Sequence, residues 1–245
     1  MMTRIWPIAL GVVTDSLRRK VVYVVLVFAA LLAFAIPSLP DYGLGVEAAV
    51  FREVALALSF VTALVVTLSL AANRIPSELE RRTIYNVVAK SVSRWEYLVG
   101  TWLGIFIVAG GAMAAFTVIE QAVGLITYGE PMWRLWQGAL AIWLEMGVVA
   151  AFAVAISAVS GPVVVVTATL TALFIGHSRS TLLGGEGALA LQPFMPSLDA
   201  FNVVNPVAHG TGVPPLYLLS MVVVFVGLSG ISLLVGGLLL ARRDL

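Results

Sequence analysis

The sequence predicts an all-α polytopic membrane protein with six transmembrane helices, an N-terminal interfacial helix, a short cytoplasmic helix and a re-entrant outer segment before the last span. Of its 245 residues, 60% are hydrophobic and only 11% are charged, whereas soluble domains carry about a quarter charged residues. Apolar runs of bilayer-spanning length recur with short polar joints between them. Little length remains for a soluble domain, so residues 1–245 are predicted to form a single transmembrane domain.

The first part of the chain divides into an amphipathic stretch and two spans. Residues 3–17 mix apolar side chains with Arg4 and Asp15, a pattern that suits a helix lying in the membrane interface. Residues 17–36 are long enough to form the first span, and prolines and a glycine break the pattern after it. A short amphipathic piece then leads into the second span, predicted at residues 54–72.

The second half contains four further apolar runs and one irregular segment. Residues 177–215 are rich in proline and glycine but too apolar for a solvated loop, so short re-entrant or interfacial helices are predicted there. The remaining spans are predicted at residues 94–128, 137–159, 163–175 and 216–241.

Six spans place both termini and the connection between spans two and three on the same side of the membrane. Eleven of the 14 basic residues fall on that side, and three, namely Arg52, Arg134 and Arg179, fall on the other. The positive-inside rule therefore predicts cytoplasmic termini.

The connection over residues 73–100 carries eight charged side chains in an otherwise apolar sequence. Ser77 with Glu80, and Ser93 with Glu96, have the spacing of capping boxes, so a helix is predicted to start at each site. A short helix of this kind is marginal in water without a docking partner. The alternative is a solvated connection whose charges only set the topology.

This connection also resembles a known segment. The matching residues are Glu80, Thr83, Ile84, Lys90, Val92, Ser93, Arg94, Trp95, Leu98, Gly100, Leu103 and Gly104. They resemble the cytoplasmic segment between spans two and three of bacterial ABC transporter permeases of the type-2 exporter class, which include relatives of the nitrous-oxide-reductase maturation permease. Arg82, Ser91 and Thr101 differ from the common Gly, Pro and Lys. The likeness in layout covers nearly the whole chain, but only this motif is specific.

The resemblance implies an export permease in the bacterial inner membrane, paired with a second copy or a paralogue and driven by separate ABC ATPase subunits. Residues 73–96 would be the coupling segment that docks into the ATPase. The implied ATPase-coupling residues are Glu78, Glu80, Arg81, Arg82, Thr83, Ile84, Val87 and Lys90.

Several functions are disfavoured by what the sequence lacks. No G-x-x-x-x-G-K-[ST] loop occurs, so ATP and Mg²⁺ are expected on the partner subunit, with no enzymatic activity and no cofactor in this chain. No basic patch with interleaved aromatics suggests a nucleic-acid partner. Two alternatives remain: a non-transporting component that transmits ATPase work to an outer accessory protein, and an intramembrane enzyme.

Two acidic residues, Glu120 and Glu145, fall inside predicted spans. A charge there is costly unless it faces water or a partner. They are therefore either polar cavity residues or a proton site, or else hydrogen-bonded structural carboxyls.

Two further patterns concern metal binding and helix packing. The spacing of His177 and His209 with nearby acidic residues does not suggest a metal site. Gly100 and Gly104 form a G-x-x-x-G pair, which indicates close helix packing either within the subunit or between subunits.

Overall fold

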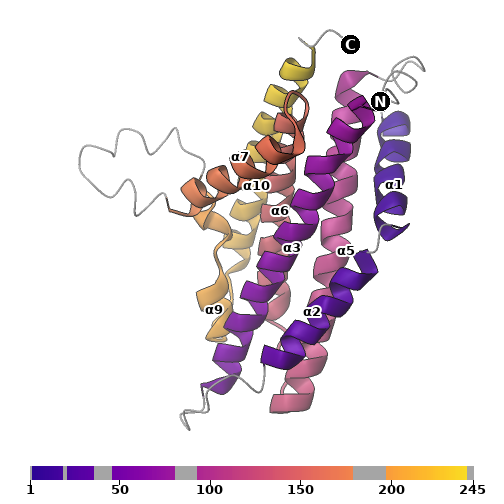
Figure 1. Ribbon diagram of the computed structural model, residues 1–245. Coiled ribbons are helices and arrows are strands. Elements are labelled where there is room, and N and C mark those ends of the chain that lie inside the picture. Colours follow the sequence, from indigo (N-terminus) through magenta and orange to yellow (C-terminus); the bar gives the residue numbers. More distant parts are fainter. Residues whose placement is uncertain (1, 19–20, 36–45, 81–92, 179–196, 242–245) are drawn as a thin grey trace.

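The computed structural model describes residues 2–18, 21–35, 46–80, 93–178 and 197–241 (Figure 1). The regular structure in these ranges is entirely helical, which confirms the predicted class. The helices are α1 (Met2–Arg18), α2 (Val21–Ala35), α3 (Glu47–Glu80), α5 (Arg94–Tyr128), α6 (Leu135–Ser157), α7 (Pro162–His177), the 3₁₀ helix η3 (Asp199–Phe201), α9 (Val204–Ala208) and α10 (Pro215–Ala241).

Four helices are long and apolar enough to cross a membrane, as expected for a multi-pass membrane protein. They contain the segments Glu47–Ile75, Arg94–Tyr128, Leu135–Ser157 and Pro215–Ala241. The helices at the predicted first and fifth spans, α2 and α7, have 15 and 16 residues, whereas a span needs about 20. That the chain has six spans stays a prediction.

Helix α5 has the bounds that the sequence predicts. It continues through Glu120 and Gln121 and ends at Tyr128, where Gly129 adopts a left-handed conformation with φ of 73° and its amide donates to the Leu125 carbonyl. The Gln121 side chain bonds both backbone groups of Met132, at 2.6 and 2.9 Å. This polar side chain therefore fixes the turn into α6 and does not interrupt α5.

Helix α3 is longer than predicted at both ends. The amphipathic piece before span two forms its first turns, and the helix continues through Pro76 and Ser77 to Glu80. The predicted helix start at Ser77 is therefore wrong. The buried face of α3 extends as far as Ile75, which is fully buried, so packing holds the helix together where local capping chemistry would begin a new one. Pro76 removes one backbone hydrogen bond there and crowds the carbonyl four residues earlier, but the helix continues past it.

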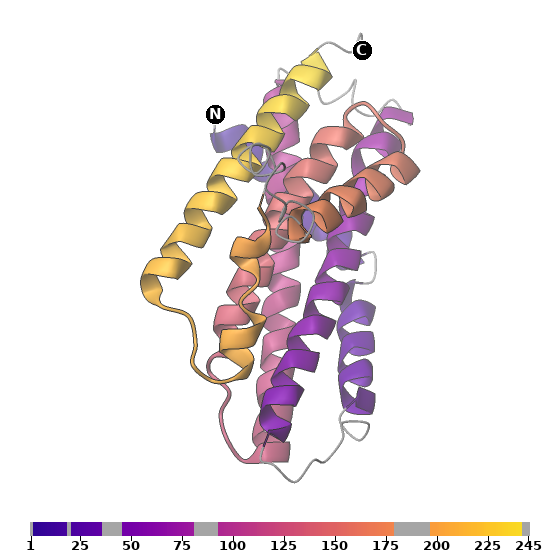
Figure 2. The same cartoon turned by 90° about the vertical axis from the view of Figure 1, so that its left-hand side faces the viewer.

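The long helices form an elongated bundle in which α6 is central and α10 is peripheral (Figures 1 and 2). In their most apolar windows, 78% of α6 is buried, against 17% of α10. The start of α1, the end of α3, the start of α5 and the end of α10 lie together at what we call the termini end. The opposite end, where α3 begins and α5 ends, is the far end. Helix α7 crosses the bundle obliquely and ends part-way along it.

The segment before α10 packs into the bundle. Phe201, Val203 and Val207 are buried, and α9 contacts α3 and α6. Leu198 lies over Gly176, close to the end of α7, where a Cβ would come within 2.8 Å of its side chain. This burial accounts for the apolar composition of the segment, and its re-entry into a membrane remains a prediction.

Candidate functional site

The connection between α3 and α5 is followed by a well-defined helix start. The Ser93 amide donates to Glu96 Oε2 at 2.9 Å, and the Glu96 amide donates to Ser93 Oγ at 3.2 Å. This reciprocal pair is the predicted capping box, and it satisfies amides that the first turn of α5 cannot pair internally. The prediction at Ser93 is confirmed.

Two glycines bring α1 against the first turns of α5. A Cβ at Gly100 would lie 2.8 Å from Ile8 Cβ, and one at Gly104 would lie 2.5 Å from Val12 Cβ. The two helices run in the same direction, because the later glycine meets the later residue of α1. The close packing predicted from the G-x-x-x-G pair is confirmed, and its partner is α1 of the same chain. The predicted interfacial position of this helix stays a prediction.

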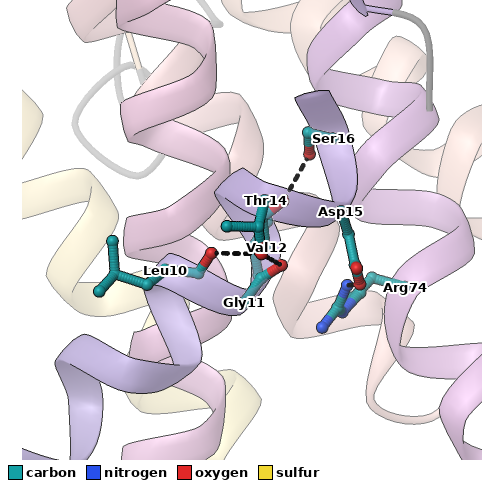
Figure 3. Close-up of polar contacts among 7 residues, drawn as sticks. All are labelled: Leu10, Gly11, Val12, Thr14, Asp15, Ser16 and Arg74. Carbon is teal, nitrogen blue, oxygen red and sulfur yellow. Dashed lines mark hydrogen bonds and ion pairs between the residues drawn. The ribbon is translucent and has the colours of Figure 1, made fainter. Parts of the chain in front are cut away.

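An ion pair also joins α1 to α3 (Figure 3). Arg74 Nη1 donates to Asp15 Oδ2 at 2.5 Å. The neighbouring Thr14 and Ser16 hydroxyls bond to backbone carbonyls of α1 itself. Asp15 is therefore the polar side chain of this turn that reaches across to α3.

The start of α5 is joined to the end of α10 as well. Arg94 Nη1 donates to the carbonyls of Leu240 and Ala241, at 2.8 and 3.1 Å. A cation at a helix C-terminus also interacts favourably with the helix dipole. Helices α1, α3, α5 and α10 are thus connected to one another at the termini end, in an arrangement we call the junction.

The predicted ATPase-coupling residues lie beside this junction in the sequence. Glu78 and Glu80 belong to the last turn of α3, whereas Arg81, Arg82, Thr83, Ile84, Val87 and Lys90 lie outside the described residues. What the structure describes is therefore the attachment of both flanks of residues 81–92.

The two predicted intramembrane carboxyls lie at separate places in the bundle. Glu120 is fully buried, and Ser59 Oγ of α3 donates to its Oε1 at 2.5 Å. The other carboxyl oxygen, Oε2, is buried and has no hydrogen-bond partner among the described residues. Ser59 of α3 is therefore the described partner of this buried carboxyl.

Glu145 pairs with the histidine that ends α7. Its Oε1 lies 2.6 Å from His177 Nε2, and its side chain is only 3% exposed. Phe60 of α3 presents its ring edge-to-face with the imidazole, with centroids 6.0 Å apart. Because Ser59 and Phe60 are adjacent, neighbouring residues of α3 contact the two carboxyl sites.

The Glu145–His177 contact was not anticipated from the sequence, although a signal for it exists. Helices α6 and α7 form a hairpin whose turn lies near residue 160, so positions at similar distances from the turn lie at similar heights. Glu145 is 15 residues before Ser160 and His177 is 17 after it. A carboxyl and an imidazole at similar heights in two neighbouring apolar helices are expected to form a hydrogen bond, because few other polar groups are available there.

The contacts described here connect helices and do not form a metal centre. Within the described residues, no three His, Asp or Glu side chains gather as metal ligands would. His209 Nδ1 lies 3.1 Å from the Asn205 carbonyl of its own turn. This contact shares no residue with the Glu145–His177 pair. Glu186, one of the acidic residues near these histidines in the sequence, lies outside the described residues.

Comparison with known proteins adds no relative from which a role could be inferred. The chain matches no protein-family model and no curated protein.

Proposed function

We propose that this chain is the membrane-spanning permease subunit of an ATP-driven ABC exporter of the type-2 class, with residues 73–96 as the segment that couples it to a separate ATPase. The observation that supports this proposal best is the junction. Both flanks of residues 81–92 are attached to the same helix, α1, through Asp15 with Arg74 and through the glycines of α5.

This arrangement is suited to transmitting a push. A coupling segment transmits motion only if its displacement moves the attached helices together and does not merely bend the chain where the segment joins them. Because α1 holds the end of α3 and the start of α5, a displacement of the connection is delivered to both helices at once. Arg94 extends the same attachment to α10. ATP-driven closure of the partner would thereby rearrange the bundle as a unit.

The proposed assembly contains two permease subunits and two ATPase subunits in the bacterial inner membrane. The chain crosses the membrane six times, with α2 and α7 as the short first and fifth spans and both termini in the cytoplasm. The ATPase subunits bind ATP and Mg²⁺, and this chain contributes the path and the coupling segment.

Charge reversal in the connection tests the proposal. In the Arg81→Glu/Arg82→Glu variant, two cations become anions at the proposed docking surface, and we expect at least about tenfold weaker association with the ATPase subunit because like charges then face each other. Co-purification of the membrane chain with its ATPase measures this directly, and cargo-stimulated ATP hydrolysis measures coupling.

A matched control is available in the same sequence. The Arg242→Glu/Arg243→Glu variant makes the same charge change in the C-terminal tail and should retain the ATPase. Unchanged co-purification and unchanged stimulated hydrolysis in the Arg81/Arg82 variant would rule out the coupling assignment. ATPase binding without cargo-stimulated hydrolysis in the unaltered protein would instead favour mechanical transmission to an outer partner.

A further inference from the structure

The far end of the bundle contains a basic pocket that takes no part in the proposed coupling. The pocket is open and has a volume of about 450 Å³. Two arginines from separate elements contribute to it, Arg52 from the second turn of α3 and Arg134 from the cap of α6. The lining residues used here are Arg52, Met132, Trp133, Arg134, Gln137 and Gly210.

Neither arginine is neutralised by the part of the chain that the structure describes. Arg52 Nε donates to the Ala48 carbonyl at 2.9 Å, and Arg134 Nη1 donates to the Thr211 carbonyl at 2.8 Å. Both acceptors are uncharged, and no ion pair joins either arginine to a described carboxylate. Since a guanidinium has five N–H donors, each arginine retains donors for a ligand.

The backbone beside the two arginines is fixed. Gly210 and Gly212 have φ of 71° and 72°, a conformation that other residues rarely adopt. A Cβ at Gly210 would lie 3.3 Å from Arg52 Nη1, and one at Gly212 would collide with Arg134 Nη1. Gln137 Oε1 accepts from the Val213 amide at 2.9 Å. The backbone of this turn therefore lies close to both guanidinium groups, and both arginines line the same pocket.

We propose that this pocket binds the phosphate group of an anionic phospholipid headgroup. Guanidinium groups match the oxygens of phosphate in geometry and charge. The volume far exceeds that of a small ion or a single water, which occupies about 30 Å³, so an organic headgroup fits. Trp133 at the pocket is 70% exposed and Trp136 beside it is 41% exposed, and tryptophan concentrates at the headgroup level of membranes.

Lipid binding can be measured on the purified chain without any ATPase, by native mass spectrometry and by thermal unfolding in detergent. The probes are phosphatidylglycerol, phosphatidylcholine and inorganic phosphate. We expect phosphatidylglycerol to bind and to raise the unfolding temperature more than phosphatidylcholine does. Arg52→Gln and Arg134→Gln should each weaken that binding by about tenfold, the equivalent of one charge-assisted hydrogen bond.

Two comparisons make the outcome decisive. Arg243→Gln removes the same charge in the C-terminal tail and should bind phosphatidylglycerol normally, whereas Arg52→Lys, which keeps the charge without the planar fork, should bind with intermediate affinity. If Arg134→Gln does not fold, Arg52→Gln decides alone, because the hydrogen bond that Arg52 makes to a described residue lies within its own helix.

Three results would overturn the proposal. Equal binding of phosphatidylglycerol to the Arg52→Gln variant and the unaltered protein would exclude the pocket as its site. Equal stabilisation by the two lipids would exclude selection of an anionic headgroup. Saturation by inorganic phosphate with no preference for the lipid would identify a free anion as the ligand in place of the headgroup.

Discussion

The two ends of the bundle use arginine in opposite ways. At the termini end, Arg74 pairs with Asp15 and Arg94 donates to carbonyls of α10, so these cations join helices. At the far end, Arg52 and Arg134 line a pocket, and their hydrogen bonds to described residues go to uncharged carbonyls. Basic residues at one end of the bundle therefore join helices, whereas those at the other end line an open pocket.

In the middle of the bundle, between these two ends, the polar contacts between helices are made by carboxyl groups. Glu120 and Glu145 each bond to a side chain from another helix, Ser59 and His177. Both of these carboxyl residues are buried, whereas the side chain of Asp15 is 47% exposed. Loss of a partner should therefore matter more in the middle than at the junction.

The largest effect is expected from filling the glycine contact of the junction. Gly104→Leu would force a side chain into the 2.5 Å between its Cβ position and Val12, and we expect it to lower the free energy of unfolding by about 3 kcal/mol or more because α1 must separate from α5. Denaturant unfolding of the protein in detergent measures this.

The control for this substitution is Gly111→Leu, because no heavy atom lies within 4 Å of a Cβ at Gly111. It inserts the same side chain into the same helix and should change stability little. Equal destabilisation by both variants would contradict the packing of α1 on α5 and weaken the contrast between the two ends.

An intermediate effect is expected in the middle of the bundle. His177→Ala leaves the Glu145 carboxyl buried without this partner, which should destabilise the protein by about 2 kcal/mol. His209→Ala removes an exposed histidine and should cost less than about 0.5 kcal/mol. Calorimetric or denaturant unfolding of both variants tests the difference, and equal effects would show that the Glu145–His177 contact is not formed.

The smallest effect is expected at the ion pair of the junction. A double-mutant cycle with Asp15→Asn and Arg74→Gln should give a coupling free energy of about 0.2–1 kcal/mol, because both side chains remain partly in contact with solvent. The coupling should shrink as salt is added. A coupling free energy larger than the loss of stability in His177→Ala, or one insensitive to salt, would contradict the prediction that the junction ion pair contributes less than the Glu145–His177 contact.

Local chemistry accounts for the features that were predicted well. The limits of α5 follow from the Ser93 cap at one end and Gly129 at the other, both of which act within a few residues. The start predicted at Ser77 failed for the converse reason. Its capping pattern was sound locally, but the buried face of α3 continues to Ile75, and packing overrode the local preference.

Sequence pattern alone predicted the all-α class with long apolar helices, the close approach of a helix at Gly100 and Gly104, and the presence of polar groups inside the apolar runs. These properties depend on hydropathy, capping and side-chain size, which are encoded at single positions or over one or two turns. These properties show where a helix requires a close neighbour or a hydrogen-bond partner, but not which residue provides it.

Which helices and side chains pair with one another became known only from the tertiary structure. The pairing of α1 with α5, of Asp15 with Arg74 and of Glu145 with His177 depends on how far each helix is rotated and shifted against its neighbours. The same is true of the pocket that contains Arg52 and Arg134. A rotation of a helix by one residue turns a side chain by about 100°, so contacts between residues 30 or more positions apart are fixed by packing and not by pattern.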